Sequence, residues 1–150
     1  MSKSVIGAFA AAVTLSLAVP AFAAPVTASG NVSVSQSVSL NCSITLAGDR
    51  STAGGVTTIT LSANGVRLRA GDLLCPAVAL TGTWTATYSG TGAAVPVSIT
   101  NVGANSLTGT CGPATISGSY NTTTNVLTIP VQSIPGSPSA CNLGGSLTVT

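Results

Sequence analysis

The sequence predicts an all-β protein, either a β-sandwich or a closed barrel of about eight to ten short antiparallel strands. Two observations support this fold class. Apolar and polar residues alternate over most of residues 24–150, and a period of two is typical of half-buried strands. Gly, Pro and Asn punctuate the alternating segments at short intervals, as turns between strands do. Helical spacing is nowhere sustained.

Residues 1–23 are expected to be a cleaved secretory signal peptide. They combine a basic start at Lys3, an apolar run over residues 5–19 and the small-residue site Ala21-Phe22-Ala23. The run is shorter than the roughly 18 to 20 apolar residues of a membrane span, and no later segment approaches that length, so we expect no transmembrane segment. Residues 24–150 are expected to form a single all-β domain, secreted to the extracellular space or kept in the periplasm.

The first long alternating segment runs from Val32 to Leu46. It is longer than the usual strand of about 5 or 6 residues, so a bend or break near Gln36 is expected. The dipeptide Asn64-Gly65 then predicts a two-residue type I′ hairpin. The hairpin would place Arg67 and Arg69 together on its polar face. Its expected pairs are Ala63 with Val66, Leu61 with Leu68, and Ile59 with Ala70.

The rest of the chain carries further alternating segments separated by turn residues. Trp84 stands on the same face of its strand as Ala86 and Tyr88, so we interpret it as a core residue rather than a ligand anchor. The expected strands are 83–88, 95–100, 115–120, 126–131 and 146–150.

Four cysteines in an exported chain predict two disulfides. They are Cys42, Cys75, Cys111 and Cys141. Four cysteines allow three connectivities; Cys42 with Cys75 and Cys111 with Cys141 is favoured because neighbours in sequence often pair. Each bridge would stabilise the fold by about 4 kcal/mol in the chain-entropy model. Zinc is not expected, because structural zinc sites usually contain close cysteine pairs and these four are widely spaced.

Charged residues make up only 4% of the chain, against roughly 25% in typical soluble domains. After the signal segment the charged side chains are Asp49, Arg50, Arg67, Arg69 and Asp72, and we expect the two aspartates to be solvated in turns beside arginines. Without His, Glu or Lys, the mature chain lacks the usual general bases. We therefore predict no catalytic residues, cofactor or metal, and no nucleic-acid site.

Several short motifs occur in a distinctive order. They are Leu40-Asn41-Cys42, Cys75, Thr81-Gly82-Thr83-Trp84-Thr85, Cys111-Gly112-Pro113, Ile116-Ser117-Gly118-Ser119-Tyr120-Asn121, and Cys141 before Gly145-Ser146-Leu147. Over roughly residues 28–150 the chain resembles the PraA/PraB-type alkane oxidation protein activators of bacteria. The resemblance implies a secreted, non-enzymatic protein that promotes growth on long-chain alkanes, acts at the oil and water interface, and belongs to the extracellular matrix.

Two specific functional hypotheses follow, beside the general one of a soluble exported domain that binds a partner. The first is an accessory protein of alkane oxidation whose partners are apolar surfaces, because an uncharged amphipathic surface associates readily with them. The alternative is self-association as the structural subunit of an extracellular fibre or pilus, in which one copy completes the sheet edge of the next. The alternation before Cys42 is similar to that of secreted pilins of the spore-coat-U type.

Overall fold

The computed structural model describes residues 23–150, so the predicted signal peptide lies, apart from its last residue, outside the described residues. The described chain is almost entirely β-structure, with one short 3-10 turn, η1 (Cys75–Ala77). The strands are β1 (Ala24–Ser35), β2 (Ser39–Ala53), β3 (Val56–Ser62), β4 (Arg69–Gly71), β5 (Ala79–Thr81), β6 (Thr83–Ser89), β7 (Val95–Ser106), β8 (Gly109–Asn121), β9 (Val126–Ile134), β10 (Gly136–Ser137) and β11 (Cys141–Val149).

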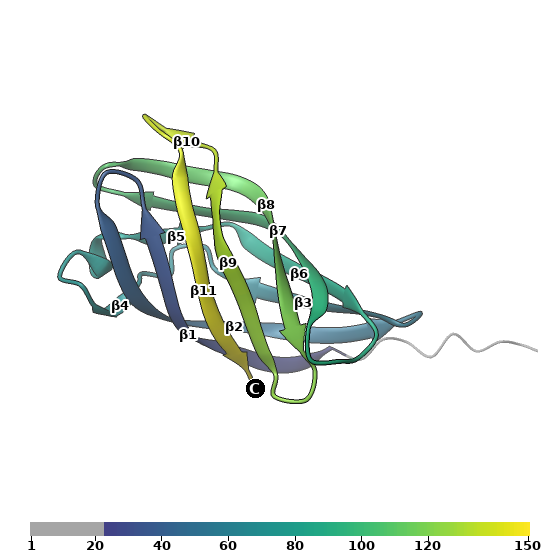
Figure 1. Ribbon diagram of the computed structural model, residues 1–150. Coiled ribbons are helices and arrows are strands. Elements are labelled where there is room, and N and C mark those ends of the chain that lie inside the picture. The colour runs from purple at the N-terminus through teal and green to yellow at the C-terminus, as the bar shows by residue number, and fades with distance from the viewer. Residues whose placement is uncertain (1–22) are drawn as a thin grey trace, which may run out of the picture.

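Eight of these strands form a closed antiparallel barrel (Figure 1). Their order is β8, β9, β11, β1, β2, β3, β6 and β7, and pairing between β7 and β8 closes the ring. The three short strands attach beside it, β4 to β2, β5 to β7 and β10 to β8. The all-β prediction is therefore confirmed, and of its two architectures the chain adopts the barrel.

The predicted break near Gln36 is confirmed as a hairpin turn between β1 and β2. β1 pairs with β2 along its whole length, from Ser35 opposite Ser39 to Ala24 opposite Arg50. On its other edge β1 pairs with β11, which in turn pairs with β9. The strands nearest the two ends of the described chain therefore have partners on both sides, and neither offers the free edge on which a fibre through the termini would depend.

The barrel interior is filled by apolar side chains. The alternating residues of each strand are buried as the sequence pattern predicts, and Trp84 is only 3% exposed. Its indole N–H donates to the Thr81 carbonyl at 3.1 Å, which satisfies its one polar group. A cavity beside Trp84 and Leu143 measures about 10 Å³, barely one water. Trp84 is thus a core residue, and the lumen there holds no ligand-sized space.

The prediction around Asn64-Gly65 is only partly right. The turn forms, with Gly65 at φ 80° and the Val66 N–H bonded to the Ala63 carbonyl at 2.9 Å. The hairpin pairing is wrong, because Leu61 lies opposite Gly48 of β2 and Trp84 of β6. In that position both edges of β3 pair with neighbouring strands of the barrel wall. The segment after the turn instead reaches β2 through β4.

Both disulfides have the favoured connectivity. Cys42 is bonded to Cys75, and Cys111 is bonded to Cys141. The first joins the start of β2 to the η1 turn, and the second joins the starts of β8 and β11. Because these strand starts share one end of the barrel, both covalent links lie at that end.

Candidate functional site

The antiparallel topology gathers the connections at two ends of the barrel (Figure 1). One end carries the connections over residues 36–38, 63–78, 106–109 and 135–140. The opposite end carries the turns over residues 54–55, 90–94 and 122–125. We call the first the apolar end and the second the polar end, after the side chains that each exposes.

Four large hydrophobic side chains are exposed at the apolar end. Leu73 and Leu107 are 95% and 81% exposed, and Val38 and Leu74 are about half exposed. Large apolar side chains of soluble monomers are usually exposed singly, and a cluster at one place typically marks an interaction site. Among residues 23–150, the other exposed large hydrophobics are Val56 at the polar end and Val131 on the barrel wall.

A groove runs between these side chains. It lies between the β1–β2 hairpin, the loop around η1 and the β7–β8 turn, and its lining includes Val38, Leu40, Leu74 and Leu107. Its volume is about 40 Å³, room for about three waters. The groove can therefore take the end of an alkyl chain but cannot enclose a long one, which makes this end a surface rather than a pocket.

The two disulfides support the loops that present these leucines. Exposed leucines give their own loops no buried area, so the loops need another source of order. The bond from Cys75 to Cys42 fixes the η1 turn next to Leu73 and Leu74. The Asp72 carboxylate adds a local contact, because it accepts the Asn41 backbone N–H at 2.6 Å.

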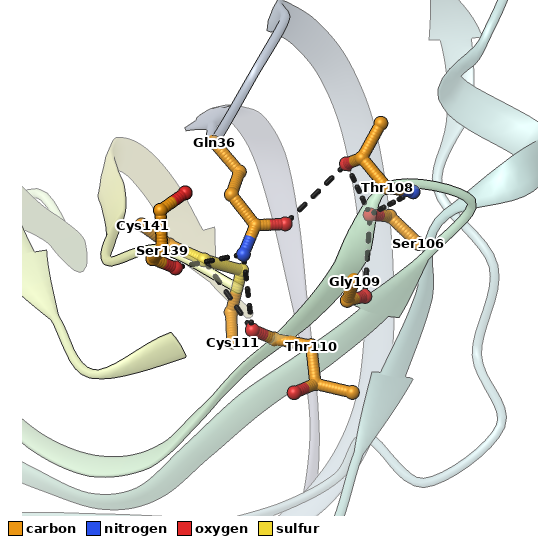
Figure 2. The surroundings of a disulfide bond; sticks show 8 residues. All are labelled: Gln36, Ser106, Thr108, Gly109, Thr110, Cys111, Ser139 and Cys141. Carbon is orange, nitrogen blue, oxygen red and sulfur yellow. Dashed lines mark hydrogen bonds between the residues drawn. A yellow bond between two sulfur atoms is a disulfide. The ribbon is translucent and has the colours of Figure 1, made fainter. Parts of the chain in front are cut away.

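Gln36 links the hairpin tips of this end (Figure 2). Its amide nitrogen donates to the Ser139 carbonyl at 2.7 Å and to the Thr110 carbonyl at 3.4 Å. Its amide oxygen accepts the Thr108 hydroxyl at 3.3 Å. One side chain thus ties the β1–β2 turn to the β7–β8 turn, beside the Cys111–Cys141 disulfide.

The polar end is held together by a different set of contacts. Asp49 is exposed as expected, but it lies in β2 rather than in a turn, and the neighbouring Arg50 is on the inward face of that strand and half-buried. Arg50 donates to the Tyr120 hydroxyl at 2.7 Å, and that hydroxyl donates to Asn125 Oδ1 at 3.0 Å. The Tyr88 ring packs 4.8 Å from the Tyr120 ring. Burial raises the pKa of Tyr120, while the Arg50 charge opposes that rise.

The described residues bring together no recognisable reactive group. Within residues 23–150, no three side chains of the metal-binding types lie close enough to hold an ion. Asp49 and Asp72 sit at opposite ends of the barrel, so they do not form a carboxylate pair. In the same part of the chain, no helix has the length and apolar character needed to cross a membrane.

Sequence reasoning did not single out the exposed leucines, although two signals were available. Leu73 and Leu74 are adjacent, and two neighbours cannot both face the core of one strand. Leu107 lies between Ser106 and Thr108 in a short turn, where no alternation buries it. In the sequence, the exposed leucines of the apolar end can thus be recognised as apolar residues that break the period of two.

These features define a disulfide-bonded, closed antiparallel β-barrel with a filled interior and an apolar surface at one end. A family model described as alkane oxidation protein activator PraA/PraB-like matches residues 1–150. The chain therefore belongs to this family, and the resemblance is confirmed over the whole sequence. Searches of curated proteins and of solved structures gave no match.

Proposed function

We propose that this protein is an exported, non-enzymatic accessory factor of alkane oxidation that adsorbs to oil through the apolar end of its barrel. Family membership supports the link to alkane oxidation. The two disulfides and the absence of a membrane-spanning helix in residues 23–150 are compatible with a periplasmic or extracellular location.

The single observation that carries the proposal is the exposure of Leu73 and Leu107 at one end of a barrel whose interior is full. An alkane cannot be stored inside such a barrel, so contact with oil has to be external. Moving two leucine side chains from water into oil is favourable by about 3 to 6 kcal/mol in total. Few charged side chains oppose adsorption, because ionised groups resist transfer from water.

Adsorption to hexadecane droplets tests the proposal. The mature protein is mixed with droplets of known area, and the protein left in the aqueous phase is measured. The variant Leu73→Ser/Leu107→Ser should bind roughly 100-fold more weakly or worse, because about 3 kcal/mol or more of transfer energy is lost. The matched control is Val131→Ser, which removes another well-exposed apolar side chain from the barrel wall.

Unchanged binding of the double leucine variant, or an equal loss in Val131→Ser, would show that adsorption does not use the apolar end. A wild-type protein that stays in the aqueous phase would remove the proposed function altogether. Circular dichroism of each variant establishes that the barrel is folded before binding is compared.

A second candidate function is a self-assembling fibre or matrix subunit, which one feature of the barrel wall favours. Strands β8 and β9 pair only over Ser119–Asn121 and Val126–Thr128. Beyond that, the Gln132 side chain bonds the Ser117 backbone N–H at 3.1 Å and carbonyl at 2.8 Å, where a strand neighbour would otherwise pair. The edge of β8 beside Ser117 thus has no strand partner but is capped by Gln132, so a strand of another copy can add there by displacing that side chain.

Electron microscopy and size-exclusion chromatography of concentrated mature protein test this candidate. If copies join along β8, filaments form, and Ser117→Pro abolishes them because proline lacks the N–H needed for strand pairing. Thr115→Ser is the mild control on the same strand. A protein that remains monomeric at high concentration, with oil droplets also present, removes the fibre role.

A further inference from the structure

A second hollow lies beside the apolar end and carries two arginines. It is an open depression of about 1130 Å³ where β2 separates from β3. Arg67 and Arg69 line it together with Thr45, Ser62 and Pro76. These are two of the three arginines in the chain, and the third, Arg50, is half-buried at the opposite end.

Both arginines keep hydrogen-bonding capacity for a partner from outside. Arg67 donates through one nitrogen to the Pro76 carbonyl at 3.0 Å, which fixes its position and leaves its remaining N–H groups available. Within residues 23–150, the Arg69 guanidinium has no hydrogen-bond acceptor from the protein, and both side chains are exposed. The neighbouring carboxylate, Asp72, is already hydrogen-bonded to the Asn41 backbone.

The arginine hollow and the apolar groove share a wall, the η1 turn. Pro76 lines the hollow, while Leu74 and Ala77 of the same loop line the groove. Along the chain, only a few residues separate Arg67 and Arg69 from Leu73. A surface that touches the exposed leucines therefore lies next to two arginines that form no ion pair with a carboxylate of residues 23–150.

We infer that the arginine hollow and the apolar groove together recognise oil that carries alkanoate, an alkyl chain ending in a carboxylate. The inference rests on the proposed function and names the kind of oil surface to which the protein binds most tightly. Oxidation of an alkane at its terminal carbon leads through the alcohol and aldehyde to the carboxylic acid, so oil undergoing oxidation acquires this headgroup. Guanidinium groups bind carboxylates through two parallel hydrogen bonds, and the leucines stay in the hydrocarbon beside them.

Hexadecane droplets that differ only in the headgroup at their surface test the inference. Hexadecane droplets are prepared plain, with hexadecanoate, or with hexadecanol, at pH 8 and low salt. Wild-type protein should bind the hexadecanoate droplets about 10- to 30-fold more tightly than the other two, as expected for two arginines near an anionic surface. The difference should shrink at 0.5 M NaCl, where charges are screened within a few ångströms.

The variant Arg67→Gln/Arg69→Gln should lose the preference for hexadecanoate and keep the affinity for plain hexadecane. Its control restores the net charge at the polar end through Thr123→Lys/Thr124→Lys, both exposed sites in the β8–β9 turn. The preference for hexadecanoate should stay lost in this variant with four substitutions, because the position of the charges matters.

Three results would overturn the inference while leaving the proposed function standing. They are equal binding of wild type to all three droplets, recovery of the preference in the charge-restored variant, and equally tight binding to oil-free vesicles of an anionic phospholipid. If wild type binds no droplet of any kind, the proposed function itself fails. The two failures are therefore distinguishable in one series of measurements.

Discussion

The connections at the two ends of this barrel are held in place by different means. At the polar end, short turns of Gly, Thr and Asn join the strands, and Arg50, Tyr120 and Asn125 form a hydrogen-bonded chain across the mouth. At the apolar end two of the four connections are long, leucines face solvent, and both disulfides lie at the base of the loops. The difference indicates that covalent links replace buried area where apolar side chains are kept outside for a partner.

The largest expected effect comes from the covalent links of the apolar end. Cys111→Ala/Cys141→Ala should lower the free energy of unfolding by about 2 to 5 kcal/mol, because the closed loop no longer restrains the unfolded chain. Urea denaturation measures the loss. A change below about 1 kcal/mol would mean that the hydrogen bonds of Gln36 and the strand ladder hold this end without the disulfide.

Breaking the hydrogen-bonded chain of the polar end should have the next largest effect. Tyr120→Phe removes the hydroxyl between Arg50 and Asn125 and leaves the half-buried guanidinium without its acceptor. We expect a loss of about 1 to 3 kcal/mol in unfolding free energy and no change in droplet binding. Reduced droplet binding by this variant would contradict the separation of the two ends.

The link between the hairpin tips of the apolar end should contribute less. Gln36→Ala removes the bonds to Ser139, Thr110 and Thr108, at a cost of about 1 kcal/mol because the site is exposed. Ser37→Ala in the same turn is the control and should change little. Hydrogen exchange at residues 106–110 should accelerate in the Gln36 variant alone.

The smallest expected effect is a loss of stability at alkaline pH, which arises from Tyr120 at the polar end. Burial raises the pKa of Tyr120 above its ordinary value of 10.0. Above that pH the unfolded chain releases the proton more readily than the folded protein, so stability should fall as pH rises past 10. Urea denaturation at pH 8 and pH 11 should show a smaller fall for Tyr120→Phe than for wild type. An equal fall in both proteins would place the sensitivity elsewhere.

Much of this architecture could be predicted from local patterns. Alternation located most strands and the inward position of Trp84, and excess strand length located the turn at Gln36. The hairpin pairing predicted around Asn64-Gly65 is wrong because a turn signal does not identify the partner of the strand before it. Here β3 gains two buried edges by pairing with β2 and β6, which outweighs a local hairpin.

The candidate site was less accessible from sequence. A break in the period of two marks Leu73 and Leu107, but it does not tell which end of a barrel their loops reach. Likewise, Arg50 continues the inward face of β2 after Ile44 and Leu46, yet a charged residue there is the less common case. In both cases the closed topology, rather than a local pattern, decides where the side chain goes.

Hydrogen–deuterium exchange of the protein adsorbed to hexadecane droplets tests the central claim most directly, because it reports which end faces the oil. We predict slower exchange on adsorption at residues 72–78 and 106–109 of the apolar end. The turns at residues 54–55, 90–94 and 122–125 should exchange as they do in free protein. Equal slowing at both ends, or slowing confined to the barrel wall around Val131, would contradict the account.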